Sequence, residues 1–455
     1  MVHAFYLNGY YIALDVCSGA VHVLDKPAYD MIGLLEPPLS ETCPENVLKA
    51  LSPKYSDETI TGTYSELYQL YKAGQLFTED DYEQFTGMMK DAPIKSICLH
   101  VSHDCNLRCK YCFASTGDFG EGRKLMSLET GKKAIDFVLE NSGTRKNLEL
   151  DFFGGEPLMN WEVVKEIVAY GREREKEYGK HFRFTITTNG VLMNDEVIDF
   201  INSEMSNVVL SLDGRPEVND RLRVTVNGKG SYDIIVDNFK KLVDKRRQGK
   251  YKEYYVRGTF TKYNLDFAND ALHIADLGFD QLSVEPVIAD PSEPYALTES
   301  DIPAIFQEYD RLSQEFIRRK KAGNGFNFFH FMIDLDQGPC AIKRLRGCGC
   351  GNEYVAITPD GDIYPCHQFV GHEEWKMGNI MEGTLDRDKK NVFAEANIYK
   401  KEGCRDCWAR FYCSGGCNAN NYEYCGDILK PNPLSCEIEK KRVECAIMIK
   451  AAMAE

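Results

Sequence analysis

Strand and helix patterns alternate through the middle of this chain, from residue 96 to about residue 310. Runs rich in β-branched and aromatic residues, such as SICLHVS and NVVLSLDG, are followed by amphipathic stretches such as ETGKKAIDFVLENS. Strands that are joined by helices run parallel, because the helix returns the chain to the same end of the sheet. About six such units predict an α/β fold, a partial (β/α)6 TIM-like barrel whose active site lies at the C-terminal ends of the strands.

The segments on either side of this barrel differ from it in composition. Residues 1–80 combine the strand runs HAFYLNGYYIALD and SGAVHVLD with two helical patterns, which predicts a winged-helix module. We expect a polar linker at residues 81–95 and a bridging helix and loop at residues 311–339. Residues 340–455 form a cysteine-rich domain.

The charge and the hydropathy pattern exclude several classes of protein. A formal net charge of −16 argues against a nucleic-acid partner, which needs a basic surface. The start of the chain lacks the pattern of a signal peptide, and no run of about 18 apolar residues predicts a membrane span. We therefore expect a cytoplasmic protein without a membrane partner.

The 17 cysteines are clustered: three lie within residues 105–112 and eleven within residues 340–445. In a chain without a signal peptide, such spacing indicates metal sites rather than disulfides. The first group, in HDCNLRCKYCF, has the spacing Cys105-x3-Cys109-x2-Cys112 directly after the first predicted strand. Thiolate-bound zinc and iron–sulfur centres usually have four attachment points, so one ligand is missing. Three alternatives stay open: core cysteines on one helical face, a zinc site, or a [4Fe–4S] cluster with one free iron.

This motif resembles the CxxxCxxC cluster motif of the radical SAM superfamily. The resemblance implies that Cys105, Cys109 and Cys112 hold a [4Fe–4S] cluster whose fourth iron binds S-adenosylmethionine (SAM). Reductive cleavage of SAM would then release a 5′-deoxyadenosyl radical. The turns GGEP, TTNG, SLDG and SVEP follow at later strand ends, in the order that the family shows. The residues that the resemblance places at SAM are Tyr111, Gly154, Gly155, Glu156, Pro157, Thr188, Asn189, Ser211, Arg223 and Val284.

The C-terminal cysteines resemble the SPASM extension of radical SAM enzymes, which binds two auxiliary [4Fe–4S] clusters and so implies three clusters in all. The resemblance assigns Cys348, Cys366 and Cys417 to the first auxiliary cluster, with Cys340 as a further ligand. Cys350 has a spacing that fits as well as that of Cys348. The resemblance assigns the second auxiliary cluster to Cys404, Cys407, Cys413 and Cys436. Two zinc ribbons are the alternative, and we expect the remaining cysteines, including Cys425, to be ordinary.

The N-terminal pattern resembles the recognition element of enzymes that modify ribosomally made peptides. With the other two domains, it looks most like a thioether-forming maturase of the six-cysteines-in-forty-five-residues peptide, of the sactisynthase type. This implies a cysteine-rich precursor peptide with a leader as substrate, and a flavodoxin or ferredoxin as electron donor. The alternatives are sulfatase formylglycine maturation, carbon–carbon crosslinking, or a metal-stabilised binding protein. Sulfatase-maturating enzymes carry an aspartate base where this chain has His367, and we assign no acid–base residue.

Overall fold

The computed structural model describes residues 1–90, 92–249, 253–335 and 344–454. Cys340, an expected cluster ligand, lies outside the described residues.

The N-terminal module is a three-stranded antiparallel sheet with helices on one face. Its strands pair in the order β1 (Val2–Leu7), β2 (Tyr10–Asp15) and β3 (Val21–Leu24). The first predicted strand run is two strands, because Asn8 and Gly9 have φ values of 50° and 94° and turn the chain. The covering helices are α1 (Lys26–Ile32), α2 (Glu45–Leu51) and α3 (Asp57–Lys72).

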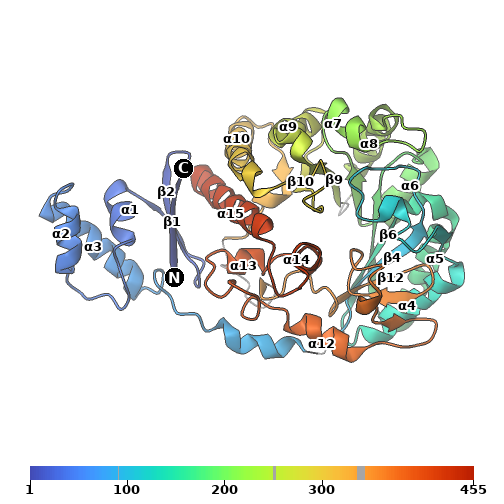
Figure 1. Cartoon of the computed structure of the whole chain (residues 1–455), viewed down its shortest axis with the longest axis horizontal. Helices are drawn as coiled ribbons and strands as arrows, with labels where there is room; N and C mark the ends of the chain where they lie inside the picture. Colours follow the sequence, from blue (N-terminus) through green and yellow to red (C-terminus); the bar gives the residue numbers. More distant parts are fainter. Residues whose placement is uncertain (91, 250–252, 336–343, 455) are drawn as a thin grey trace.

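A partial barrel of parallel strands follows, as predicted (Figure 1). Its strands lie side by side in the order β4 (Ser96–His103), β6 (Asn147–Gly154), β7 (His181–Thr188), β8 (Asn207–Ser211), β9 (Glu253–Phe260) and β10 (Gln281–Pro286). The helices of this region are α4 (Leu128–Asn141), α5 (Trp161–Tyr178), α6 (Asp195–Glu204), α7 (Pro216–Leu222), α8 (Tyr232–Arg246), α9 (Phe267–Asp276) and α10 (Ile302–Lys321). One face of each strand packs on helices, and Leu150, Phe184 and Val256 are fully buried there.

The sheet extends beyond the limits that the sequence predicts. Strand β11 (Asn327–Phe328) continues it beside β10, and β12 (Tyr354–Ile357) pairs in parallel with β4. Strands β13 (Asp362–Tyr364) and β14 (Gly378–Asn379) follow β12, while β5 (Lys124–Leu125) pairs with β4. Among the described residues the two ends of this sheet do not pair, so the barrel is open. The predicted boundary at residue 310 falls inside α10.

The short helices complete the secondary structure. The expected linker contains the 3-10 helix η1 (Tyr82–Met89). The other 3-10 turns are η2 (Ser115–Gly117), η3 (Pro157–Asn160), η4 (Lys262–Asn264), η5 (Glu299–Asp301), η6 (Phe329–Phe331) and η7 (Glu373–Trp375). The C-terminal region adds α12 (Arg387–Glu395), α13 (Arg410–Cys413), α14 (Asn418–Cys425) and α15 (Pro433–Ala454).

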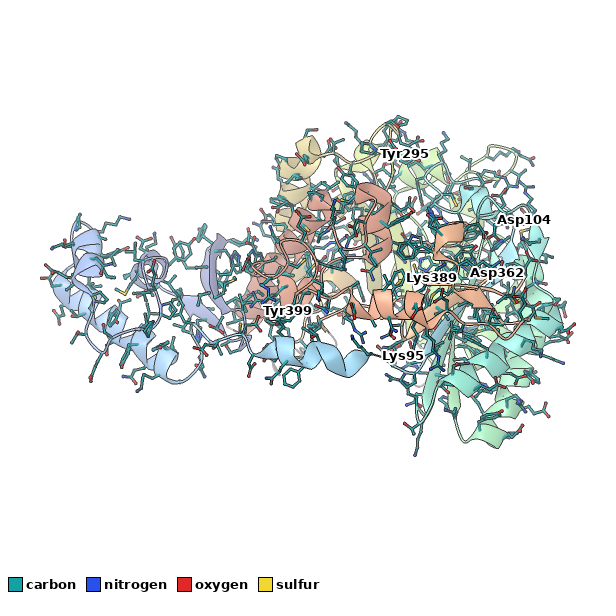
Figure 2. The ribbon with its side chains drawn as sticks, turned by 60° about the horizontal axis from the view of Figure 1, so that its bottom comes forward. Lys95, Asp104, Tyr295, Asp362, Lys389 and Tyr399 are labelled. Atoms are coloured by element: carbon teal, nitrogen blue, oxygen red, sulfur yellow. The ribbon has the colours of Figure 1, made fainter. Side chains whose placement is uncertain are left out.

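Helix α15 lies between the N-terminal module and the barrel (Figure 1) and contacts β1, β2 and α10. The ring of His3 stacks on Trp408 with centroids 3.7 Å apart, and its Nε2 lies 2.9 Å from Glu444 Oε1. Tyr399, labelled beside the linker helix in Figure 2, donates to Asp80 Oδ1 at 2.7 Å. The module is therefore packed on the cysteine-rich region and shares buried surface with it.

In the described part of the chain, no helix is both long enough and apolar enough to cross a membrane.

Candidate functional site

The first three cysteines lie on a loop that follows β4 and is fixed by its own backbone. The amide of Cys105 donates to Asp104 Oδ1 at 2.8 Å, and the Leu107 amide lies 3.4 Å from Cys105 Sγ. The amides of Arg108 and Lys110 donate to the carbonyls of Val224 and Leu222, at 2.7 and 3.0 Å. These bonds hold the cysteine loop against the segment that carries Arg223.

The predicted GGEP turn packs directly on this loop. A Cβ atom on Gly155 would lie 2.2 Å from the carbonyl oxygen of Asp104, and one on Gly154, whose φ is +121°, would lie 2.2 Å from that of Ser102. A Cβ atom on Gly117, whose φ is +103°, would lie 2.7 Å from the Cβ atom of Cys105. Glycine is required at these positions because the backbones approach too closely for any side chain.

A buried carboxylate joins the ends of β6 and β7. Glu156 accepts hydrogen bonds from Thr188 Oγ1 at 2.7 Å, the Asn189 amide at 2.8 Å and the Leu158 amide at 3.1 Å. Burial raises the pKa of Glu156 to about 7, although these donors oppose the shift. The side-chain amide of Asn189 lies 3.6 Å from Cys105 Sγ. The structure thus brings the predicted GGEP and TTNG residues together beside the first cysteine.

A second buried network joins the cysteine loop to the end of β8. The hydroxyl of Tyr111 donates to Asp213 Oδ2 at 2.7 Å, and Arg223 Nη1 donates to the Tyr111 oxygen at 2.8 Å. Arg223 Nε is buried and has no hydrogen-bond partner among the described residues. Sequence reasoning missed Asp213, although it belongs to the same SLDG turn as Ser211.

Two other predicted residues occupy different faces of their strands. Ser211, at the end of β8, is half-buried and pairs in register with Arg257 of β9. The Val284 side chain is fully buried in the main core with Leu282, on the face of β10 opposite to Ser283 and Glu285. Its side chain therefore points away from the strand-end site, because successive strand residues alternate.

One group of C-terminal thiols gathers where β12 and β13 meet α14. The thiols of Cys348, Cys350, Cys366 and Cys417 lie close enough to influence one another's ionisation. The buried Cys350 thiol donates a hydrogen bond to Cys366, which lowers the pKa of Cys366, and burial raises the pKa of Cys350. The sequence favours Cys348 over Cys350 at this position, whereas the fold brings both to Cys366.

A second group surrounds a cavity of about 540 Å³. Cys404, Cys407, Cys413 and Cys436, the four residues that the family resemblance assigns to the second auxiliary cluster, all line it. Cys425, which the sequence leaves as an ordinary cysteine, is a fifth thiol in the wall. The sequence offers little reason to expect Cys425 here, because Cys425 lies outside the C-x2-C-x5-C-x3-C spacing of Cys404, Cys407, Cys413 and Cys417.

In each of the three groups, burial protects at least one thiol from ionisation until a cation binds. Burial raises the pKa values of Cys105 and Cys417 to about 12 and that of Cys404 to about 11. Such thiols become thiolates when a bound metal supplies the opposing charge. Among the described residues, no three His, Cys, Asp or Glu side chains are placed to hold a single metal ion. Both zinc sites and iron–sulfur clusters use thiolate ligands, and the three groups offer such ligands.

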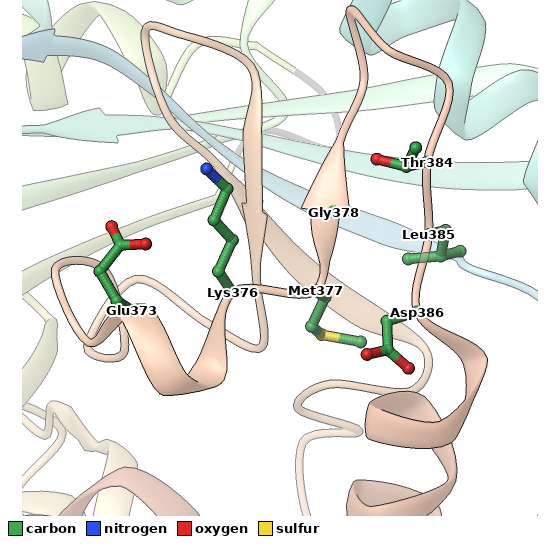
Figure 3. A pocket seen from close by; sticks show the side chains of 7 residues that line it. All are labelled: Glu373, Lys376, Met377, Gly378, Thr384, Leu385 and Asp386. Carbon is green, nitrogen blue, oxygen red and sulfur yellow. The ribbon is translucent and has the colours of Figure 1, made fainter.

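A further cavity, of about 620 Å³, lies at the surface between η7 and the start of α12 (Figure 3). Its polar groups already have partners. Lys376 lies 2.8 Å from Asp362, Glu373 accepts from the Tyr364 hydroxyl at 3.3 Å, and Asp386 caps α12. This cavity offers no free ligand group comparable to Arg223 Nε.

Comparison with known proteins supports this view of the fold. The model of the radical SAM superfamily matches residues 99–258, and that of the SPASM iron–sulfur cluster-binding domain matches residues 348–408. A cysteine-type anaerobic sulfatase-maturating enzyme of Clostridium novyi is 28% identical, over 72% of this chain and 89% of its own length.

Two solved structures have the same fold. A sulfatase-maturating enzyme with bound SAM, anSMEcpe, gives a TM-score of 0.66 at 21% identity, over 80% of this chain and 99% of that one. SuiB of Streptococcus suis, bound to SAM, gives 0.52 at 17% identity, over 96% of this chain and 98% of that one. The present chain thus consists of a radical SAM domain on an open barrel, followed by a SPASM domain.

Proposed function

We propose that this chain forms thioether crosslinks between cysteine sulfurs and carbon atoms of a ribosomally made precursor peptide. One observation carries the proposal. A three-thiol loop at the strand ends occurs in the same chain as an N-terminal sheet with an accessible edge strand, β3. Among the described residues β3 pairs only with β2, while α15 contacts both β1, the other edge strand, and β2.

Cys105, Cys109 and Cys112 would hold the cluster, and SAM would lie against the GGEP turn. When bound, the two supply a 5′-deoxyadenosyl radical, which abstracts a hydrogen atom from the peptide. Arg223, whose Nη1 lies 4.0 Å from Asp213 Oδ1, would bind the SAM carboxylate through its Nε, because a buried donor without a partner needs an acceptor. Tyr111 and Asp213 would fix the orientation of Arg223.

The two C-terminal thiol groups would hold auxiliary clusters. Cys348, Cys350, Cys366 and Cys417 would bind one of them, so that four described cysteines complete it without Cys340. Cys404, Cys407, Cys413 and Cys436 would bind the other inside the 540 Å³ cavity. Clusters held there would supply an acceptor for the one electron that thioether formation releases. A flavodoxin or ferredoxin would be the donor that reduces the cluster at Cys105, Cys109 and Cys112.

The leader of the precursor would add a strand along β3. An exposed strand edge binds an extended peptide through backbone hydrogen bonds, while side-chain contacts select its sequence. Val23 of β3 is 56% exposed and is available for such a contact. Tethering through the leader raises the effective concentration of the core peptide at the barrel.

Sulfatase maturation is the second candidate, and the similarity to sulfatase-maturating enzymes favours it. Two observations weigh against it. The site of the family's aspartate base is occupied by His367, whose Nδ1 lies 3.0 Å from the Tyr354 hydroxyl. The anSMEcpe structure also leaves a fifth of this chain unmatched, a share comparable in length to residues 1–80, whereas SuiB matches 96%.

The experiment uses the full chain with its clusters reconstituted, SAM, a reductant and a candidate cysteine-rich precursor peptide. Mass spectrometry should detect the loss of one pair of hydrogen atoms per crosslink. Conversion of a cysteine in a sulfatase peptide to formylglycine, without crosslinking of the precursor, would support the second candidate instead.

A matched pair of variants tests the docking of the leader. Val23→Lys places a charge on β3 and should lower kcat/KM for the full precursor by roughly tenfold or more. Tyr6→Lys changes a residue of β1 that is also 56% exposed, and should have little effect. Equal losses in both variants would contradict docking on β3. Deletion of residues 1–80 is a poorer test, because the module packs on Trp408 and Glu444.

A further inference from the structure

Arg257 of β9 carries an unpartnered charge inside the barrel. Its neighbours Val256 and Gly258 are buried on the helix-facing side of β9, so Arg257 lies on the interior side with Tyr255 and Thr259. Parallel pairing places it between Ser211 of β8 and Ser283 of β10. Within the described ranges, no hydrogen bond or ion pair reaches its guanidinium group, which is exposed to the barrel interior.

The charge of Arg257 reaches residues on two sides of the barrel interior. It acts on Glu285, at the C-terminal end of β10, and on His367, which follows Cys366. His367 faces the same interior, because its ring centroid lies 4.9 Å from that of Phe153 in β6. Arg257 therefore lies between the strand ends assigned to SAM and the first C-terminal thiol group.

Glu285 does not need Arg257 as a partner. Its carboxylate accepts hydrogen bonds from Ser283 Oγ at 3.1 Å and Arg442 Nη2 at 3.3 Å, and His330 Nε2 lies 3.2 Å away. Arg442 is held in turn by the Tyr309 hydroxyl, 2.8 Å from its Nε. The charge of Arg257 is thus in excess within this protein, and such a position is suited to a ligand anion.

We infer that Arg257 binds the sulfur of the substrate's reacting cysteine as a thiolate. This inference rests on the proposed function, which requires a peptide sulfur between the same two sites. A cysteine thiol ionises close to neutral pH, and a neighbouring guanidinium group favours the thiolate. The SAM carboxylate has a separate candidate partner in Arg223, which contacts the cysteine loop through Tyr111. Arg257 would therefore orient the peptide sulfur rather than the cofactor.

The test measures binding, so that it does not depend on turnover. The probes are a precursor peptide in which a single cysteine remains and its serine twin, each titrated into the reconstituted full chain with SAM present. The wild type should prefer the cysteine peptide, and Arg257→Met should lower that preference by roughly tenfold, as expected for a hydrogen bond to a charged group. Arg257→Lys, which keeps the charge, should retain part of the preference.

The pH dependence gives a second readout that a merely structural role would not move. In the wild type the cysteine preference should appear at a lower pH than in Arg257→Met, where its midpoint moves up toward about 8.5, the ordinary value for a thiol. Arg183→Met is the matched control. Arg183 lies on the same face of the sheet in β7, near the opposite end of the barrel, and pairs with Glu253 at 3.2 Å.

Three outcomes would overturn the inference. The cysteine preference could be unchanged in Arg257→Met, which would place the sulfur on another ligand. Both peptides could lose affinity equally, or SAM affinity could fall with them, which would make Arg257 a structural or cofactor-binding residue. Failure of the proposed function looks different, because the wild type would then yield no crosslinked product even though the cysteine preference persists.

Discussion

The cysteine loop after β4 and the C-terminal cysteine groups differ in number of thiols and in surroundings. The loop has three thiols, and beside it Arg223 Nε and Asn106 Nδ2 are buried without hydrogen-bond partners among the described residues. Each C-terminal group brings together at least four thiols. This difference supports the proposal that the loop takes a ligand from outside the chain, whereas the protein itself completes the C-terminal groups.

The two regions also differ in what holds them in place. Glycines of the GGEP turn and amides of the loop fix Cys105 and its neighbours to the barrel. The segment from Cys404 to Cys413 is held by the N-terminal module, since Arg410 Nη2 lies 3.0 Å from Asp80 and 3.4 Å from Cys17 Sγ. A substitution in the N-terminal module should therefore disturb the second C-terminal thiol group more than it disturbs the barrel.

The largest effect is expected from Cys109→Ala. Loss of one of only three thiols should remove the cluster that binds SAM, lower the iron content by about four atoms per chain, and reduce 5′-deoxyadenosine formation by roughly a thousandfold or more. Iron analysis and chromatography of the products measure both quantities. Cys43→Ala, in the N-terminal module, is the control. If Cys109→Ala still formed 5′-deoxyadenosine at the full rate, the cysteine loop would not be the SAM-binding site, and its distinction from the C-terminal thiol groups would be wrong.

Cys350→Ala sharpens the comparison within the C-terminal region. Because Cys350 lies against Cys366, we expect this variant to lose about four irons of an auxiliary cluster while it still cleaves SAM without peptide. Cys348→Ala should behave in the same way. If Cys350→Ala keeps its full iron content while Cys348→Ala loses iron, the fourth ligand is not Cys350. The first C-terminal thiol group would then resemble the cysteine loop, because only three of its described thiols would bind the cluster.

Arg410→Met tests how firmly the N-terminal module and the second C-terminal group are joined. Arg410 is only 4% exposed, and its replacement leaves Asp80 without its buried partner. We expect the free energy of unfolding to fall by about 3 kcal/mol. Thermal unfolding of the reconstituted chain measures this loss. Arg405→Met, which breaks an exposed pair with Glu83, should cost less than about 1 kcal/mol; equal losses would contradict the distinction.

The smallest effect concerns Asp151, which faces the barrel interior beside Cys98. Burial raises the pKa of Asp151 to about 6, so the folded state binds its proton more tightly than the unfolded state does. The resulting stabilisation is complete below about pH 4 and is lost as the pH rises to about 6. Asp151→Asn should remove this decline, which is about 3 kcal/mol for a fully buried carboxyl group and less for Asp151, which is half-buried. Denaturant unfolding at several pH values measures it, and an unchanged slope would contradict the assignment.

The sequence predicted the barrel and the first cysteine loop well because both depend on local patterns. The alternation of strands and helices is strong over residues 96–310, and CxxxCxxC lies directly after a strand. Strands β11 and β12 were missed because two to four residues carry too little periodicity. Asp213 and Arg257 were missed because their roles follow from strand register and pairing, which no single segment reveals.

The choice between Cys348 and Cys350 shows a different limit. Both spacings fit the pattern, and only the fold places the Cys350 thiol against Cys366. Cys425 is a similar case, because α14 returns its thiol to the cavity from outside the motif. Spacing identifies a group of ligands, but direction and burial decide which thiols belong to it.

Electron paramagnetic resonance of the reduced, reconstituted chain tests the central claim most directly. Addition of SAM should shift the signal of one cluster and leave the others unchanged, because the proposal gives the three-thiol loop one position for an outside ligand. The shift should disappear when Cys105, Cys109 and Cys112 are all replaced by alanine, and it should persist in Cys350→Ala. A SAM-dependent shift that survives the triple replacement, or its absence from the wild type, would contradict the account.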